Sequence, residues 1–123
     1  MKICVTAAEA TLESAVDTRF GRCRYFIFFD METGECVAQE NPNAEFSGGA
    51  GIQSGQLMAA KGVRAVLTGN VGPNAFRTLQ TAGIEVYTGT AGSVKEAIER
   101  YKAGGLEKAS APGAAKSGLQ GKE

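Results

Sequence analysis

The 123-residue sequence predicts an α/β protein in which a parallel sheet is extended by an antiparallel hairpin. Two observations predict this fold class. In the second half of the chain, short apolar segments alternate with helical patterns, and strand–helix–strand connections place their strands in parallel. In the first half, a strongly apolar segment is followed by a short turn and a more polar segment, which requires antiparallel pairing. A chain of this length is expected to form one domain with its own hydrophobic core.

The first half contains three expected strands. Residues 2–6 are a short apolar run, which predicts a buried strand. Residues 24–30 are apolar on both alternating faces, a pattern typical of a strand inside a sheet that is covered on both sides. We therefore expect Phe26 and Phe28 to be buried. Residues 35–40 form the more polar return strand of the hairpin.

The second half contains three expected helices, each entered from a glycine-rich loop. In order, the sequence predicts the loop 47–51 and a helix to residue 61, the strand 63–67, the loop 68–72 and a helix that ends at residue 83, the strand 84–87, and the loop 88–92 with a third helix. Ser93 and Glu96 form a capping box at the start of that third helix. After residue 102 the chain is rich in Gly, Ala and Ser without periodicity. This composition predicts a cofactor-binding domain over 1–102 and a flexible tail over 103–123.

Composition excludes several classes of function. The 13 basic and 13 acidic residues balance, so nothing global indicates binding to nucleic acid or to a membrane surface. No apolar run is long enough to cross a bilayer, and the chain turns polar by Glu9, so no signal peptide is expected. Three cysteines without a CxxC pair argue for a reducing, cytoplasmic location. The absence of histidine excludes imidazole ligands and His-based catalysis.

The stretch of residues 17–23 carries the most chemistry for its length. Arg19, Arg22 and Cys23 lie around a Phe20-Gly21 pair, directly before the apolar strand. Arginine is a permanently charged fork suited to anions, and thiolate is a soft metal ligand. Together they favour a site for an anionic, metal-containing ligand. The alternative is that Cys23 packs as a small hydrophobic residue beside solvated arginines.

The glycine loops are expected to meet this stretch at one edge of the sheet. In a parallel α/β sheet the ligand crevice lies at the carboxyl ends of the strands, and helix N-termini favour anions. The expected cofactor-binding residues are Arg19, Phe20, Gly21, Arg22, Ser47, Gly48, Gly49, Gly51, Gly69, Asn70 and Asn74, with Cys23 as a metal ligand. The alternative is that the glycines serve only tight turns.

The three cysteines are expected to differ. Cys23 lies between two arginines in a loop, so we expect its thiol pKa to be lowered. Cys4 and Cys36 fall within expected strands, and we expect both to be core residues. Dinucleotide binding is weakly supported, because residues 49–53 match only part of the glycine fingerprint and Asn70 stands where a ribose-binding acid is sought. No glycine loop is followed by Lys-Ser or Lys-Thr, so a P-loop is excluded.

Three motifs resemble a known family. They are Phe20-Gly21-Arg22 after the first strand, Asn41-Pro42 followed by residues 47–51, and Gly69 to residues 72–76. In this order and spacing they resemble the dinitrogenase iron–molybdenum cofactor biosynthesis family, of the NifX and NifB C-terminal type, which includes the orange molybdenum–copper protein. The resemblance covers about residues 1–106. It implies a three-layer α/β/α fold with a ribonuclease H-like motif and a five-stranded mixed sheet.

The resemblance also implies a function. It implies binding or carrying of an iron–molybdenum-type or molybdenum, copper or iron sulfide cluster, or of its precursor, without catalysis and with cluster-handling ATPases as partners. The alternative is a regulatory or scaffold domain that binds such a partner without a cluster. The first expected strand carries no carboxylate, so ribonuclease chemistry is rejected. The pathway served, nitrogen fixation or another metal–sulfur pathway, stays open.

Two positions depart from the family pattern. Where many members have His before Phe-Gly, this chain has Arg19, and where many have Ala after the arginine, it has Cys23. An imidazole is lost and a thiol is gained nearby. Either Cys23 takes the role of ligand, or the cluster is held by hydrogen bonds and charge alone.

Overall fold

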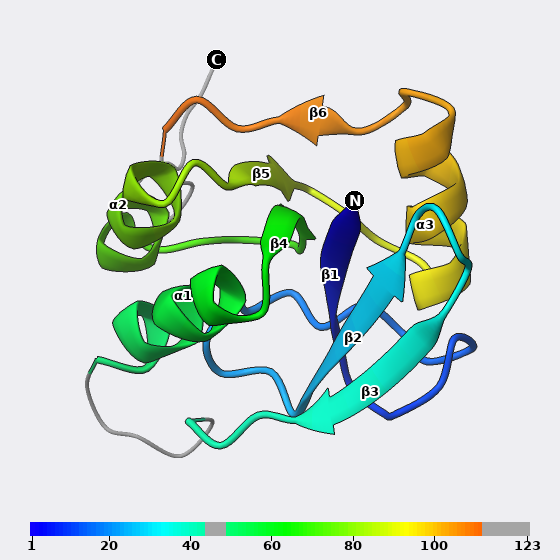
Figure 1. Ribbon diagram of the computed structural model, residues 1–123, viewed down its shortest axis with the longest axis horizontal. Coiled ribbons are helices and arrows are strands. Elements are labelled where there is room, and N and C mark those ends of the chain that lie inside the picture. Colours follow the sequence, from blue (N-terminus) through cyan, green and yellow to red (C-terminus); the bar gives the residue numbers. More distant parts are fainter. Residues whose placement is uncertain (44–48, 112–123) are drawn as a thin grey trace.

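A six-stranded mixed sheet separates two helical layers in the computed structural model, which describes residues 1–43 and 49–111 (Figure 1). Helices α1 and α2 cover one face of the sheet, and α3 covers the other. The elements are β1 (Lys2–Ala7), β2 (Tyr25–Asp30), β3 (Cys36–Glu40), α1 (Ala50–Ala60), β4 (Val63–Leu67), α2 (Pro73–Thr81), β5 (Glu85–Thr88), α3 (Val94–Lys102) and β6 (Glu107–Lys108).

The strand order is β3-β2-β1-β4-β5-β6. Strands β1, β4 and β5 are parallel, whereas β2 runs antiparallel to both β1 and β3. This is the arrangement of a ribonuclease H-like motif, so the predicted three-layer fold and its N-terminal hairpin are confirmed. The predicted strand count was one too low, because β6 adds an antiparallel strand beside β5.

The sixth strand lies inside the segment predicted to be a flexible tail. Glu107 and Lys108 pair with β5, the backbone N–H of Ala109 donates to the Val86 carbonyl at 2.7 Å, and Lys108 lies 3.6 Å from Glu85. The described part of the tail is therefore bonded to the sheet edge. A strand of two residues has no periodicity from which to predict it. Residues 112–123 lie outside the described residues.

The alternation in β2 divides the core between the two faces of the sheet. Phe26 and Phe28 pack toward α1 and α2, and Ile27 packs toward α3; all three are buried, as predicted. The expectation that Cys36 is a core residue is wrong. Its strand, β3, is at the edge of the sheet, where its side chains are mostly exposed.

Candidate functional site

An open pocket of about 650 Å³ lies at the carboxyl ends of β1, β4 and β5. We call it the carboxyl-end pocket. Four segments far apart in the sequence line it: residues 18–20 with 22, residues 49–51, residues 69–70 with 72–75, and residues 89–91. The predicted site residues that it brings together are Arg19, Phe20, Arg22, Gly49, Gly51, Gly69, Asn70 and Asn74.

The other predicted site residues are placed differently. Gly21 does not line the pocket but lies against the first turn of α1 behind it. Cys23 is buried in the core and does not line the pocket either. Ser47 and Gly48 lie outside the described residues.

Two helices begin side by side in this pocket. Gly51 in the first turn of α1 lies so close to α2 that a Cβ atom there would be 2.8 Å from the Cβ of Ala75. One turn later, a Cβ on Gly55 would be 2.8 Å from the Thr78 methyl group. These close approaches, which only glycine allows, hold the two helix N-termini together.

Neither helix N-terminus is capped by a hydrogen bond to a side chain of the helix. The N-cap residues are Gly49 for α1 and Gly72 for α2, neither makes a side-chain cap, and neither first turn contains an acidic residue. The first N–H groups of a helix have no partner within the helix and carry a partial positive charge. Two such starts in one pocket make it receptive to anions.

Arg19 is held at the mouth of the pocket by Asp17. The Asp17 carboxylate accepts hydrogen bonds from the Arg19 backbone N–H at 3.0 Å and from its guanidinium at 3.3 and 3.4 Å. These bonds, and the charge of Asp17, raise the pKa of the Arg19 guanidinium. The Asp17 side chain is only 10% exposed, whereas that of Arg19 is 62% exposed. The guanidinium is thus restrained but accessible to a ligand.

Arg22 belongs to a segment that packs directly on α1. Gly21 has φ +95°, and a Cβ on it would lie 3.0 Å from the Cα of Gly51. Both the left-handed backbone and the backbone-to-backbone contact require glycine here. The contact places Arg22 beside the start of α1, where it lines the pocket.

The loops of the pocket are bonded to one another without a ligand. The backbone N–H of Phe20 donates to the Asn70 carbonyl at 3.1 Å, and that of Gly89 donates to the Gly69 carbonyl at 2.9 Å. Gly69 is packed so tightly that a Cβ would lie 2.6 Å from the Cα of Thr18. These contacts join three loops into one preformed surface.

Two buried hydroxyl groups hold the loop that carries Arg19. Thr6 is the next-to-last residue of β1 and Thr68 directly follows β4, and their hydroxyl oxygens are 2.7 Å apart. The Thr6 hydroxyl donates to the Asp17 carbonyl at 2.7 Å. The loop that carries Arg19 is therefore anchored to the parallel strands.

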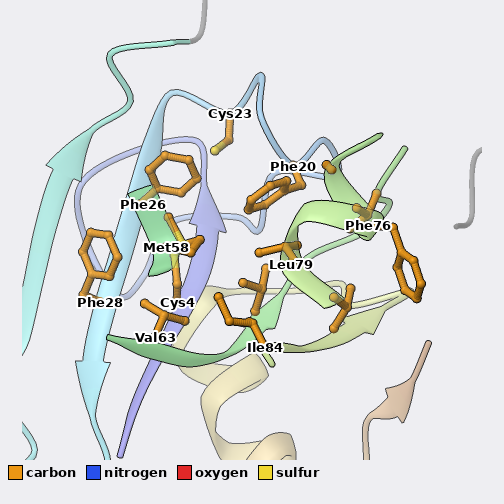
Figure 2. Close-up of a cluster of buried hydrophobic side chains, with 14 residues drawn as sticks. Cys4, Phe20, Cys23, Phe26, Phe28, Met58, Val63, Phe76, Leu79 and Ile84 are labelled. Carbon is orange, nitrogen blue, oxygen red and sulfur yellow. The ribbon is translucent and has the colours of Figure 1, made fainter. Parts of the chain in front are cut away.

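Cys23 faces the core rather than the pocket. Figure 2 shows its sulfur directed into the cluster of buried side chains, near Phe20 and Phe26. Burial, followed by the negative charge of Asp17, raises the pKa of the Cys23 thiol to about 12. The expectation of a lowered pKa is wrong because removal from water, together with the charge of Asp17, outweighs the backbone hydrogen bonds that lower it. Burial also raises the pKa of Cys4.

One contributing loop was missing from the predicted site. Gly89, Thr90 and Ala91, which connect β5 to α3, line the pocket, and Thr18 lines it beside Arg19. A signal for the loop was present, since it is the third glycine-rich loop to follow a parallel strand. No comparable signal indicated Thr18.

Comparison with known proteins identifies the family. The family model described as "Dinitrogenase iron-molybdenum cofactor" matches residues 1–104. The chain belongs to this family. The resemblance found in its motifs is thereby confirmed.

Individual relatives agree with this assignment. The apo form of the orange protein from Desulfovibrio gigas is 38% identical, with a TM-score of 0.88 over 91% of this chain and 95% of that one. A candidate NifB protein from Thermotoga is also 38% identical, with a TM-score of 0.77 over 87% and 91%. An uncharacterized protein of Methanocaldococcus jannaschii is 36% identical over 92 residues, which are 72% of this chain and 78% of the relative. Within residues 1–43 and 49–111, no helix has the length and apolar character to span a membrane.

Proposed function

We propose that the carboxyl-end pocket binds a metal–sulfur cluster, or its thiometallate precursor, as an anionic cargo. The observation that carries the proposal is the convergence of two open helix starts with Arg19 and Arg22 in one pocket. The described residues that line this pocket include no carboxylate and no thiol. A thiometallate is a polyanion with sulfide edges, which guanidinium and backbone N–H groups bind as hydrogen-bond donors.

The donors present fit an anion better than a metal ion ligated by the protein. Among the described residues, no group of three or more His, Cys, Asp or Glu side chains is placed to hold a metal. Cys23, the thiol nearest the arginines in sequence, is protonated at neutral pH and directed into the core. Of the two modes left open by the sequence, retention by charge and hydrogen bonds is therefore the one we propose.

Membership of the family supports the proposal that the pocket binds a metal–sulfur cluster. The model that matches the chain is named for the iron–molybdenum cofactor, and the orange protein was solved in an apo form, which implies a form with a bound group. We propose that this protein carries its cluster during cofactor assembly in the cytoplasm, without transforming it. Its proposed partner is an assembly protein such as a cluster-handling ATPase.

The test is reconstitution under anaerobic conditions. The full chain is incubated with tetrathiomolybdate, with or without Cu(I), and separately with iron and sulfide, and is then desalted. Metal–sulfur charge-transfer bands in stoichiometric amount are expected. Loss of either pocket arginine, in Arg19→Ala or Arg22→Ala, is expected to weaken retention roughly 10- to 100-fold, because a charge-assisted hydrogen bond contributes about 1.5–3 kcal/mol.

Arg64→Ala is the matched control. Arg64 is an exposed arginine near the amino end of β4, the opposite end of that strand from the pocket. Its loss is expected to leave retention unchanged. A protein that stays colourless in every reconstitution contradicts the cluster role and favours the scaffold alternative. Equal losses in all three variants would contradict the assignment of the site.

A further inference from the structure

Asn41 is a buried amide that holds the segment carrying Arg22. It follows β3, is 5% exposed and does not line the carboxyl-end pocket. Its Nδ2 donates to the carbonyl of Gly21 at 3.0 Å and to that of Cys23 at 2.9 Å. These are the residues immediately before and after Arg22. One side chain from the end of the hairpin therefore restrains the backbone on both sides of a pocket arginine.

The hydrogen bonds of this amide determine its orientation. Both of its N–H donors are used by the two carbonyls, and its Oδ1 accepts from the backbone N–H of Asn43 at 2.9 Å. The backbone N–H of Asn41 itself donates to the Arg24 carbonyl at 2.8 Å. A side chain of different length or without donors leaves two carbonyl groups without these bonds.

The same segment is supported from its other side by α1. Gly21, with its positive φ, packs against Gly51 in the first turn of that helix. The Arg22 backbone is thus restrained by a buried amide on one side and by a helix backbone on the other. Ordering an arginine before its ligand arrives reduces the entropy lost on binding.

We propose that Asn41 is a positioning residue for the anionic ligand, acting through Arg22. The inference rests on the proposed function, because it assumes that the pocket binds an anion. It differs from a purely structural role in one measurable respect. A structural residue affects the melting temperature, whereas a positioning residue also affects affinity, and only as long as Arg22 is present.

The experiment is a double-mutant cycle on the full chain. Tetrathiomolybdate is titrated anaerobically into the wild type, Asn41→Ala, Arg22→Ala and the double variant, with melting temperatures measured in parallel. Asn41→Ala is expected to weaken binding about 10-fold, close to the effect of losing one charge-assisted contact. The double variant is expected to bind no more weakly than Arg22→Ala, because the two residues act as one unit.

Ser14→Ala is the matched control, because it also removes a buried polar side chain that forms hydrogen bonds to the backbone of a loop. Ser14 is also 5% exposed, and its hydroxyl accepts from the Glu9 N–H at 2.8 Å and donates to the Ala15 carbonyl at 2.9 Å, outside the pocket. Its loss is expected to lower the melting temperature without changing affinity. A drop in affinity in Ser14→Ala as large as in Asn41→Ala overturns the inference, since general loosening would then explain both.

The outcomes separate the two proposals. Wild-type affinity in Asn41→Ala, or additive losses in the double variant, overturns the positioning role and leaves the proposed function standing. No binding by the wild type overturns both. If Asn41→Ala does not fold, Asn41→Ser is used instead. The serine hydroxyl can donate to at most one of the two carbonyl groups that Asn41 bonds. An intermediate loss of affinity is then expected, and wild-type affinity overturns the inference.

Discussion

The N-terminus of α3 differs from those of α1 and α2 in how its backbone N–H groups are bonded. At α3, the Ser93 hydroxyl accepts from the Glu96 N–H at 3.1 Å, and the Glu96 carboxylate accepts from the Ser93 N–H at 3.0 Å. This helix start is completed by its own side chains. The starts of α1 and α2 have glycine N-caps without side-chain bonds, and both lie in the carboxyl-end pocket. A capped helix N-terminus stabilises the fold. An N-terminus without a side-chain cap leaves its first N–H groups free to bind an anionic ligand.

Introducing an acidic N-cap residue at α2 should have the largest effect on the binding of thiomolybdate. Gly72 has an extended backbone and open space around the position of a Cβ, so Gly72→Asp is sterically allowed. The carboxylate would accept hydrogen bonds from the first N–H groups of α2 and repel an anion. Thiomolybdate affinity is therefore expected to fall about 10- to 100-fold, with the folding stability kept or slightly raised. Titration and thermal melting measure the two effects.

Gly72→Ser is the uncharged control for this variant. It offers a cap without a negative charge, so its loss of affinity is expected to be smaller. Unchanged affinity in Gly72→Asp would show that the start of α2 is not used by the ligand.

Removing the cap of α3 should affect stability alone. Ser93→Ala is expected to lower the free energy of unfolding by about 1 kcal/mol, as is typical for loss of an N-cap. Because Ser93 does not line the pocket, thiomolybdate affinity should match that of the wild type. Denaturant unfolding and titration are the measurements. Loss of affinity without loss of stability would contradict the assignment of a structural role to the N-terminus of α3 and a binding role to those of α1 and α2.

The buried thiol of Cys23 should make the stability of the fold decrease at alkaline pH. The Cys23 pKa is raised from 9.0 to about 12 in the folded protein, so the folded state favours the neutral thiol. Its contribution to stability is complete below pH 9.0 and is lost as the pH rises toward 12. Cys23→Ala should therefore show a shallower fall in melting temperature between these limits than the wild type. An identical fall in both proteins would mean that Cys23 is not the group responsible.

The smallest expected effect is that of Cys23→Ser on binding. If helix starts and arginines hold the ligand, the charge-transfer bands of the reconstituted variant should keep their positions. Because oxygen is a harder donor than sulfur, a metal ligated by Cys23 would instead give shifted bands. The absorption spectrum of the desalted variant decides between them, with thermal melting to confirm that it is folded.

The sequence alone determined the order of the elements and the edge of the sheet at which the carboxyl-end pocket lies. The order of strands, glycine loops and helices follows from local patterns in the sequence. The carboxyl ends of parallel strands lie at the same edge of the sheet, whichever side chains the loops carry. For this reason Arg19, Arg22 and Asn70 could be expected in one place before any contact was known. The capping box at Ser93 is likewise a local pattern, and it was predicted correctly.

Tertiary structure alone decided which side chains face the pocket and which support it. Cys23 turns into a core cluster that includes Cys4 and Met58, residues from distant parts of the chain that the loop sequence does not contain. The bonds from Asn41 to Gly21 and Cys23 span 20 and 18 residues, and the contact of Gly21 with Gly51 spans 30 residues. Side-chain direction in a loop has no period, so it depends on packing between elements that meet only in the folded chain.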